Sequence, residues 1–400
     1  AKKRETDRYR MLEAAKANAA KNGYQGAQYP WESADDGTEQ CPDWTIEPDG
    51  TCYRCYVAVY EHHVTAAVAY GIYNYVRITH DTEFLLHKGA EILIETARFW
   101  KSRLQYIKEN DRYEIHRVTG PDEWHEPVDN NVYTNYLARW NLRYVTALTE
   151  MLSREYPQEY TALVEKLGLT EEEIADWDAV AAKVYLPRKE GTQLLEQFEG
   201  YFDLKEAVIE KYDSNDWPIR PEILNTTKKC ETQIIKQADV VMLLHLMGQE
   251  FDEETTKLNY SYYEKRTLHG SSLSPSIYSI MGLKVGDDSK AYRYLRRAAL
   301  IDLVNLQGNT REGIHAANAG GVWQVVVFGF AGVSLDEEGM LCICPHMPPE
   351  WNGLTFRIHH LDSWLEITVH ADNSVEVKVL EGGSVEIRIQ GEKVTVRREI

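Results

Sequence analysis

The chain has 400 residues, of which 43% are hydrophobic, and a formal net charge of −19 at pH 7. This composition is ordinary for a globular protein with a large core, and the acidic excess argues against nucleic acid as a partner. No run approaches the roughly 18 apolar residues of a membrane span, and the first residues lack the apolar stretch of a signal peptide. We therefore expect a cytoplasmic protein that binds neither nucleic acid nor membrane.

The first 335 residues are dominated by apolar residues at the three-to-four spacing of amphipathic helices. This spacing predicts helices over 8–20, 64–79, 83–104, 132–156, 170–184, 233–247, 252–264, 291–306 and 318–330. Helices in succession, joined by long loops, indicate an α-barrel or α-toroid. Because such folds carry their chemistry in the connecting loops, we expect the functional site there.

From residue 339 onward the hydrophobic period changes to two, as in 364–370 and 385–389. Alternation of this kind predicts half-buried strands. We therefore expect a mainly α chain, with a helical domain over 1–335 and a small antiparallel β domain over 336–400.

The loop over 116–136 is the most informative part of the sequence, because it places three acidic side chains among aromatic and amide residues. These are Asp122, Glu123 and Glu126. Aromatic faces stack on sugar rings, and their shielding raises the pKa of a nearby carboxyl group. Such a carboxylic acid is a candidate proton donor. For Glu123 this interpretation stands beside that of an acidic start to the following helix, whereas for Asp122 and Glu126 we favour hydrogen bonding within the loop.

Asp129 lies just before the helical pattern that starts near residue 130. Its short carboxylate suits the N-cap position, where it accepts hydrogen bonds from backbone N–H groups. We therefore predict that Asp129 caps this helix and takes no part in catalysis.

The cysteine pattern leaves a metal site as the weaker interpretation. Cys41, Cys52 and Cys55 lie close together and His62-His63 follow, yet only one Cys-x-x-Cys pair is present and the third cysteine lacks standard zinc spacing. We expect free thiols and no metal.

Other loops also carry candidate binding residues. Trp31 and Glu32 follow a glycine-terminated helix, and Ser271-Ser272 precede a helical pattern. Free backbone N–H groups and hydroxyls at a helix start bind anions, so the serine pair is a candidate phosphate site, with a plain serine N-cap as the alternative.

Taken together, these loops resemble the disaccharide phosphorylases of glycoside hydrolase family 65. The matching segments are GAQYPWES (26–33), TGPDEWHEPVDNN (119–131), KQADV (236–240), YYEKRTLHGSSLS (262–274) and GIHAA (313–317). Ordered motifs over roughly 300 residues are far more specific than any one of them. The resemblance implies an (α/α)6-barrel catalytic domain followed by a C-terminal β-sandwich.

The resemblance also implies roles for individual residues. By position, the general acid is Glu123, the glucose contacts are Trp31, Lys236 and Gln237, and the phosphate site is Ser271, Ser272 and His315. The implied reaction is inverting phosphorolysis of an α-linked glucose disaccharide to β-glucose 1-phosphate and a free sugar. Inorganic phosphate is the co-substrate, and no metal or other cofactor is implied.

The sequence departs from the family pattern in two ways. The family's N-terminal β-sandwich, its helical linker and its first barrel helices are not seen, so the barrel is expected to be incomplete at its N-terminus. We therefore expect a companion N-terminal fragment, and the resemblance implies a homodimer. Trp124 and Pro127 stand where many relatives carry Tyr and Asn, which puts the acceptor sugar in doubt.

Two other functions remain open from the sequence. An inverting α-glucosidase or trehalase of the same family needs a second carboxylate as base, for which Glu264 or Glu312 is a candidate. The retained Ser271-Ser272 pair argues against such a hydrolase. A noncatalytic carbohydrate-binding fragment is the other alternative.

Overall fold

A computed structural model of the chain describes residues 2–46, 50, 52–214, 217–336 and 338–398. Within these ranges, no helix combines the length and the hydropathy that a membrane span requires. The chain divides into two compact units, which are described separately below. The first holds residues 1–206 and 229–233, and the second holds residues 207–228 and 234–400.

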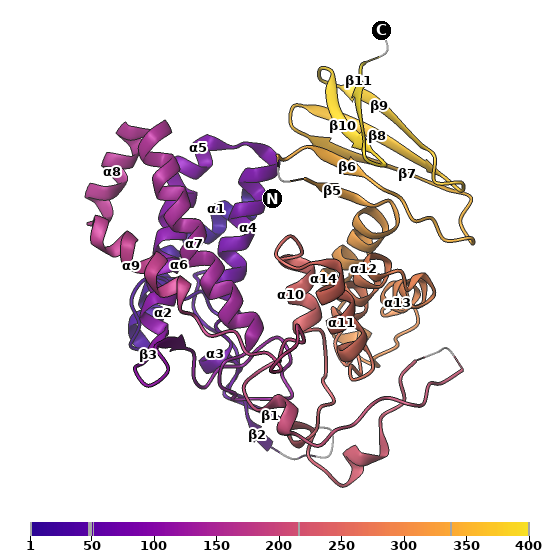
Figure 1. Cartoon of the computed structure of the whole chain (residues 1–400), viewed down its shortest axis with the longest axis horizontal. Helices are drawn as coiled ribbons and strands as arrows, with labels where there is room; N and C mark the ends of the chain where they lie inside the picture. The colour runs from indigo at the N-terminus through magenta and orange to yellow at the C-terminus, as the bar shows by residue number, and fades with distance from the viewer. Residues whose placement is uncertain (1, 47–49, 51, 215–216, 337, 399–400) are drawn as a thin grey trace. The chain divides into compact units, whose positions relative to one another are not determined.

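The first unit is mainly helical. Its α-helices are α1 (Lys2–Arg10), α2 (Leu12–Lys21), α3 (Val57–Tyr60), α4 (His63–Thr79), α5 (Thr82–Phe84), α6 (Ala90–Arg103), α7 (Val132–Glu155), α8 (Pro157–Leu167) and α9 (Glu171–Ala182), with a π-helical turn η1 (Leu85–Gly89) and 3₁₀ turns η2 (Tyr201–Asp203) and η4 (Lys229–Glu231). Helices α4, α6 and α7 pack side by side (Figure 1). They bury one apolar face each, as their three-to-four spacing predicts.

Two short hairpins interrupt the helices of this unit, and the period-two pattern gave no sign of them. They are β1 (Trp44–Ile46) with β2 (Cys52–Arg54), and β3 (Gln105–Ile107) with β4 (Arg112–Glu114), both antiparallel. With three residues in each strand, alternation is too short to be recognised.

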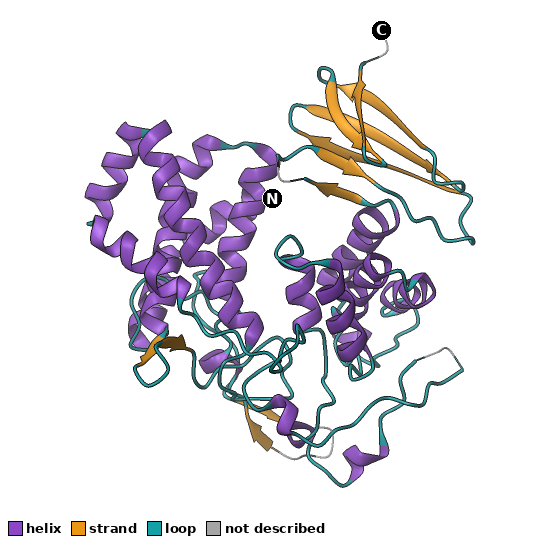
Figure 2. Ribbon diagram, viewed as in Figure 1, coloured by secondary structure: helices purple, strands orange, loops and turns teal. Residues whose placement is uncertain are grey.

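The second unit begins with helices and ends in strands (Figure 2). Its helices are η3 (Glu222–Asn225), α10 (Val240–Leu246), α11 (Glu253–Glu264), α12 (Ser274–Val285), α13 (Asp288–Leu300), η5 (Thr310–Glu312), α14 (Ala316–Gln324) and the π-helical η6 (Val325–Phe330). Helix α12 is buried on nearly every side, and α11, α13, α14 and η6 all pack against it.

The C-terminal part of this unit is a sandwich of two sheets. One sheet has the order β7-β8-β9 and the other β11-β10-β6-β5. The strands are β5 (Val333–Leu335), β6 (Leu341–Ile343), β7 (Gly353–His360), β8 (Ser363–His370), β9 (Val375–Glu381), β10 (Val385–Ile389) and β11 (Glu392–Val396). The pairs are antiparallel except β6 with β10, which is parallel. Strict alternation predicts strands but says nothing of the direction in which distant strands pair.

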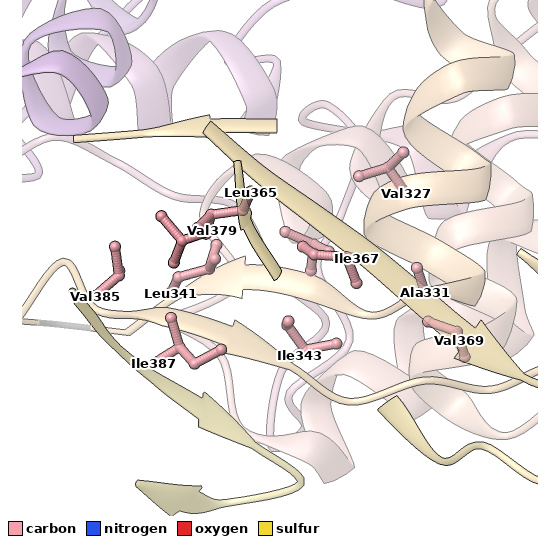
Figure 3. Close-up of a cluster of buried hydrophobic side chains, with 11 residues drawn as sticks. Val327, Ala331, Leu341, Ile343, Leu365, Ile367, Val369, Val379, Val385 and Ile387 are labelled. Carbon is pink, nitrogen blue, oxygen red and sulfur yellow. The ribbon is translucent and has the colours of Figure 1, made fainter. Parts of the chain in front are cut away.

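A single apolar core lies between the two sheets (Figure 3). On β8 the buried side chains are Leu365, Ile367 and Val369, which alternate along the strand. They meet Ile343 and Ile387 of the opposite sheet, and Val327 of η6 joins the same cluster. The sandwich is therefore anchored to the preceding helix by shared apolar packing.

Three predicted helices differ from the structure. The pattern over 291–306 yields α13, which ends at Leu300. The pattern over 8–20 is divided at Met11 into α1 and α2. The pattern over 233–247 yields a helix only from Val240, because Ile235 pairs in parallel with Thr267 and its N–H donates to the Arg266 carbonyl. This pairing with a distant segment takes the backbone groups that a helix would need.

Candidate active site

The acid loop, residues Val118 to Val128, is a closed loop between β4 and α7. Val118 and Val128 exchange two backbone hydrogen bonds of 2.8 and 2.9 Å, which close its neck. Beyond the neck, the Thr119 N–H donates to the Tyr60 carbonyl, 3.0 Å away. The loop is therefore fixed at its base and to the segment before α4.

The three acidic side chains of this loop have different surroundings. Asp122 is 1% exposed, and its carboxylate meets His125 Nδ1 at 2.6 Å and accepts from Gln197 Nε2 at 3.0 Å. Glu126 accepts from the Thr119 hydroxyl at 3.2 Å. Glu123 is partly exposed. The hydrogen-bonding roles predicted for Asp122 and Glu126 are therefore confirmed, and Glu123 has the accessibility that a proton donor to a ligand requires.

His125 holds the acid loop to a distant segment of the same unit. It is 2% exposed, and its Nε2 meets the Thr232 carbonyl at 2.8 Å. Because Nδ1 faces the Asp122 carboxylate and Nε2 faces a carbonyl oxygen, both ring nitrogens act as donors. The Asp122–His125 pair thus contains a buried proton and orders the backbone on both sides of Glu123. The sequence spacing gave no reason to select His125, Gln197 or Thr232.

The prediction that Asp129 caps the following helix is wrong. Helix α7 begins at Val132, and its N-cap is Asn131, whose side-chain oxygen accepts from the Thr134 N–H at 2.9 Å. Asp129 instead accepts from the Arg117 N–H at 2.8 Å. Asn serves as an N-cap as well as Asp does, so composition alone could not choose between the two positions.

Trp31 also lies in the first unit, on the loop after α2. The Glu39 carboxylate accepts from the N–H groups of Trp31 and Glu32 at 2.6 and 3.0 Å, which fixes this loop. The Trp31 ring meets the His63 ring edge-on at 6.0 Å, and His63 meets Tyr133 at 5.4 Å. This row of rings links the predicted glucose contact to the first turn of α7, directly after the acid loop.

The aromatic side chains near the acid loop are less available than expected. Tyr133 and Tyr136 are buried, and Arg139 lies over the Tyr136 ring. Trp124 is partly exposed, with Lys229 Nζ 5.0 Å from its ring. Only Trp124 of these three thus offers an accessible face.

The predicted cysteine cluster contains free thiols. Cys41 Sγ and Cys55 Sγ lie 3.8 Å apart, whereas Cys52 is exposed on β2. In the part of the chain that the structure describes, no three His, Cys, Asp or Glu side chains gather in a way that would hold a metal ion.

In the second unit, backbone hydrogen bonds bring together four of the predicted binding residues. The Leu268 N–H donates to the Ile235 carbonyl at 3.0 Å, and the Gly270 N–H donates to the Lys236 carbonyl at 2.8 Å. The segment of Lys236 and Gln237 therefore runs beside the one that leads into Ser271 and Ser272. A Cβ atom at Gly270 would lie 3.3 Å from Lys236 Cγ, so the absence of a side chain permits this close approach.

Ser271 and Ser272 are partly exposed and precede α12. The Ser271 hydroxyl accepts from the Leu273 N–H at 3.3 Å, and the N-cap residue Leu273 makes no side-chain cap. The alternative of a plain serine N-cap is therefore not what the structure shows.

His315 lies at the start of α14 and is oriented by Asp302. Its Nδ1 and its backbone N–H meet the two oxygens of the Asp302 carboxylate at 2.6 and 2.8 Å. These hydrogen bonds lower the pKa of Asp302. Because Nδ1 is the donor, Nε2 is the nitrogen left to face a ligand, and the Asn309 amide is 3.5 Å from it. Asp302 and His315 are 13 positions apart in the sequence, so no local motif indicated this pairing.

The two units each hold part of the predicted set. Glu123 and Trp31 are in the first, and Lys236, Gln237, Ser271, Ser272 and His315 are in the second. Within the second unit, α14 packs on α12, where a Cβ atom at Gly321 would lie 2.6 Å from Ser276 Oγ. Helix packing thus joins the element of His315 to the helix that follows the serine pair.

The chain belongs to glycosyl hydrolase family 65. Residues 4–324 match the central catalytic domain of that family, and residues 336–396 match its C-terminal domain. The family predicted from the loop motifs is thereby confirmed. So is the fold class, a mainly α chain with an (α/α)6-barrel catalytic region and a small β-sandwich at its C-terminus.

The relatives of this chain include phosphorylases of several disaccharides. Kojibiose phosphorylase of Thermoanaerobacter brockii is 52% identical over 97% of this chain and 50% of its own length. α,α-Trehalose phosphorylase of the same organism is 36% identical over 98% of this chain and 49% of its own length. A solved structure from the human microbiome, provisionally assigned as a kojibiose phosphorylase, superimposes with a TM-score of 0.85 at 29% identity, covering 98% of this chain and 50% of that one. The chain spans about half the length of the curated relatives it matches.

Proposed function

We propose that the protein catalyses the inverting phosphorolysis of an α-linked glucose disaccharide, with inorganic phosphate as co-substrate. The products are β-glucose 1-phosphate and a free sugar. The observation that carries the proposal is the acid loop, in which buried Asp122 and His125 hold the backbone on both sides of Glu123, whose side chain is partly exposed. The relatives are about twice as long as this chain. The activity is therefore proposed from the residues of this chain and is not taken over from theirs.

Each predicted residue has a chemical task in this reaction. Glu123 donates a proton to the glycosidic oxygen as its bond to C1 breaks. A phosphate oxygen attacks C1 from the opposite face, so the anomeric configuration inverts. Trp31, Lys236 and Gln237 hold the glucose ring, while Ser271, Ser272 and His315 hold the phosphate. His315 Nε2, left available by Asp302, faces the phosphate.

The surroundings of the two alternative bases favour a phosphorylase over a hydrolase. Glu264 is 3% exposed, forms an ion pair with Lys290 at 2.7 Å and accepts from the Tyr294 hydroxyl at 2.8 Å. A carboxylate committed in this way is poorly placed to activate water on the far side of a sugar ring. Glu312 is exposed on the turn η5. In a phosphorylase neither base is needed, because phosphate is itself the nucleophile.

Kojibiose is the substrate that we expect to react fastest. Kojibiose phosphorylases of two bacteria are 52% identical to this chain, whereas the trehalose and maltose phosphorylases named among its relatives are 32–36% identical. Trehalose, maltose and nigerose share the α-glucosyl group with kojibiose and differ only in which hydroxyl of the acceptor glucose carries it, so they form the comparison set.

The experiment that tests the proposal measures glucose 1-phosphate released from kojibiose, trehalose, maltose and nigerose, with and without inorganic phosphate. We expect phosphate-dependent product, largest for kojibiose, that falls at least about a thousandfold in Glu123→Gln and survives in Glu126→Gln. Free glucose formed without phosphate would identify a hydrolase instead. Loss in Glu126→Gln with retention in Glu123→Gln would move the acid to Glu126, and no product from any sugar would refute the proposal for this chain.

We also propose a catalytic domain over residues 1–335 and a β domain over 336–400, and a homodimer as the assembled form. The family matches over 4–324 and 336–396 support this division. Light scattering would report about twice the chain mass of 46.1 kDa for the dimer.

A further inference from the structure

A cavity of about 340 Å³ lies wholly within the second unit and is lined by none of the residues proposed for the phosphorylase site. It is bounded by residues 212–214 and Trp217, by α13 and by the turn after that helix. Its volume falls in the range of cavities that hold small ligands. The cavity is therefore large enough to bind a small ligand.

One wall of this cavity is strongly basic. Lys290, Arg293, Arg296 and Arg297 of α13 all line it, together with the acidic side chains of Asp213 and Glu264. The acidic groups are already engaged, because Glu264 pairs with Lys290 at 2.7 Å and Asp213 accepts from the Trp217 N–H at 2.9 Å. In a chain of net charge −19 such a concentration of cations is unexpected.

Two of the arginines differ from Lys290, which is held in an ion pair with Glu264. Among the residues that the structure describes, Arg296 and Arg297 form no ion pair, and the contact of Arg297 is with the Trp217 ring, 3.2 Å from the ring centroid. Burial lowers the pKa of Arg297 to about 10, so the group stays charged at neutral pH. The charge of Asp213 acts on Arg297, but one carboxylate beside two arginines leaves an excess of positive charge. A partly desolvated excess of this kind is costly unless a ligand provides further negative charge.

The cavity also has an apolar part. Leu300, Val304 and Leu306 line it, and Val304 and Leu306 are 57% and 38% exposed. A planar guanidinium matches the oxygens of a phosphoryl group in a bidentate manner, and the carbon atoms of a ligand would cover the leucines. We propose that this cavity binds a small phosphate monoester, with its phosphoryl group on Arg296 and Arg297 and its carbon part against Leu300 and Leu306.

The cavity lies next to the segment that we propose to bind phosphate. An effect of the cavity's ligand on phosphorolysis rests on that proposed function. Trp217 and Tyr294 line the cavity, and their rings lie 5.4 and 4.7 Å from the ring of His269. His269 is 2% exposed, meets the Ser274 hydroxyl at 2.9 Å and directly precedes Gly270 and the serine pair. An occupant of the cavity therefore acts on the phosphate-binding segment and changes the KM for phosphate.

The test is a calorimetric titration with glycerol 3-phosphate, using the full chain. We expect binding to wild type, binding at least tenfold weaker in Arg296→Gln and in Arg296→Gln/Arg297→Gln, and unchanged binding in Ser271→Ala/Ser272→Ala. Arg357→Gln is the matched control, because Arg357 lies on β7 of the same unit and its side chain is exposed. Arg296→Gln alone removes an exposed side chain, so it keeps the test valid if the double variant does not fold.

Equal binding by wild type and the double arginine variant would overturn the proposed site. Loss of binding in the double serine variant would also overturn it, because the ligand would then bind at the reaction site. Absence of binding to wild type would overturn it as well. None of these binding results changes the rate at which glucose 1-phosphate is released, so the ligand site and the phosphorylase activity can be refuted independently. In that assay, glycerol 3-phosphate is expected to shift the KM for phosphate in wild type but not in Arg296→Gln. Binding without this shift would refute the link to the phosphate segment.

Discussion

The orientation of His315 depends on a residue that the loop motifs do not contain. Both oxygens of the Asp302 carboxylate are used, one on the ring Nδ1 and one on the backbone N–H. A carboxylate in this position fixes the tautomer and the ring orientation together. The phosphate contact proposed for His315 therefore depends on Asp302 as well as on the histidine ring.

We predict that Asp302→Asn raises the KM for phosphate about tenfold, equivalent to roughly 1.4 kcal/mol, while the KM for kojibiose changes little. The amide keeps the size of the side chain but loses one of the two acceptor oxygens. Initial rates at varied phosphate and varied kojibiose measure the two values separately. Asp336→Asn is the control, since Asp336 also accepts backbone hydrogen bonds, from Met340 and Glu338, but lies at the β-sandwich. An equal rise in both KM values would contradict a role at the phosphate.

At the scale of single elements, the start of α7 decides how the acid loop is held. Asn131 is 1% exposed, caps Thr134 and donates to the Gln197 carbonyl at 3.1 Å. Gln197 in turn donates to Asp122. One helix cap therefore supports both the longest helix of the unit and the residue next to Glu123.

We predict that Asn131→Ala lowers the free energy of unfolding by about 2 kcal/mol because it removes the cap and one of the two hydrogen bonds to the Gln197 carbonyl, leaving that from the Val132 N–H. Asp129→Ala, the cap that the sequence favoured, is expected to cost less than about 1 kcal/mol. Urea unfolding followed by circular dichroism compares the two. A larger effect of Asp129→Ala would restore that residue to the role of cap.

The loop that carries Trp31 depends on a close approach to α6. Gly26 has φ +68°, and a Cβ atom there would lie 2.1 Å from the Glu95 carbonyl oxygen and 2.5 Å from the Phe99 nitrogen. Gly23 has φ +81° but nothing within 4 Å of such an atom. The two glycines thus share the backbone conformation and differ only in crowding.

We predict that Gly23→Ala costs about 1–2 kcal/mol from the left-handed conformation alone. Gly26→Ala is expected to cost about 3 kcal/mol more, because the backbone of α6 must move to accept the methyl group. Thermal unfolding of the two variants measures the difference. Similar losses of stability would show that the loop relaxes away from α6.

At the scale of the whole molecule, buried neutral histidines make stability depend on pH. Burial lowers the pKa of His62 and His269 to about 3 and that of His63 to about 4. In the unfolded chain each titrates near its ordinary value of about 6.5. Between pH 6.5 and 4 the unfolded chain therefore binds more protons than the folded one, and folding stability falls as the pH falls.

We predict that the urea midpoint is nearly constant above pH 7 and declines between pH 6.5 and 5, with each histidine contributing up to about 1.4 kcal/mol per pH unit. Burial also lowers the pKa of His245 to about 4. Because four histidines then share the slope, His269→Phe, which keeps the ring contacts, is expected to reduce it by about a quarter. His370→Gln, at an exposed position of β8, should leave it unchanged. A midpoint that does not move between pH 7 and 5 would contradict the neutral state of these groups.

Much of the fold followed from periodicity, since the helices over 63–79, 132–155 and 253–264 begin and end within one residue of their predicted limits. Each of these helices buries one face in the core, so its amphipathic spacing can be recognised from the local sequence alone. The prediction for 233–247 was wrong where Ile235 pairs with Thr267, and the parallel pairing of β6 with β10 was not foreseen. Both depend on residues far apart in the chain, which local patterns do not report.

The same division applies to the site. Its loop motifs named the family and the residue types, because glycine, proline and clustered polar side chains mark loops whatever surrounds them. Only the tertiary structure decided that Asp122 is buried against His125 and Gln197, and that His315 is oriented by Asp302. These pairs join segments up to 75 residues apart. Hydrogen bonds and burial act through space, so which of several similar carboxylates is buried is settled only when the chain has folded.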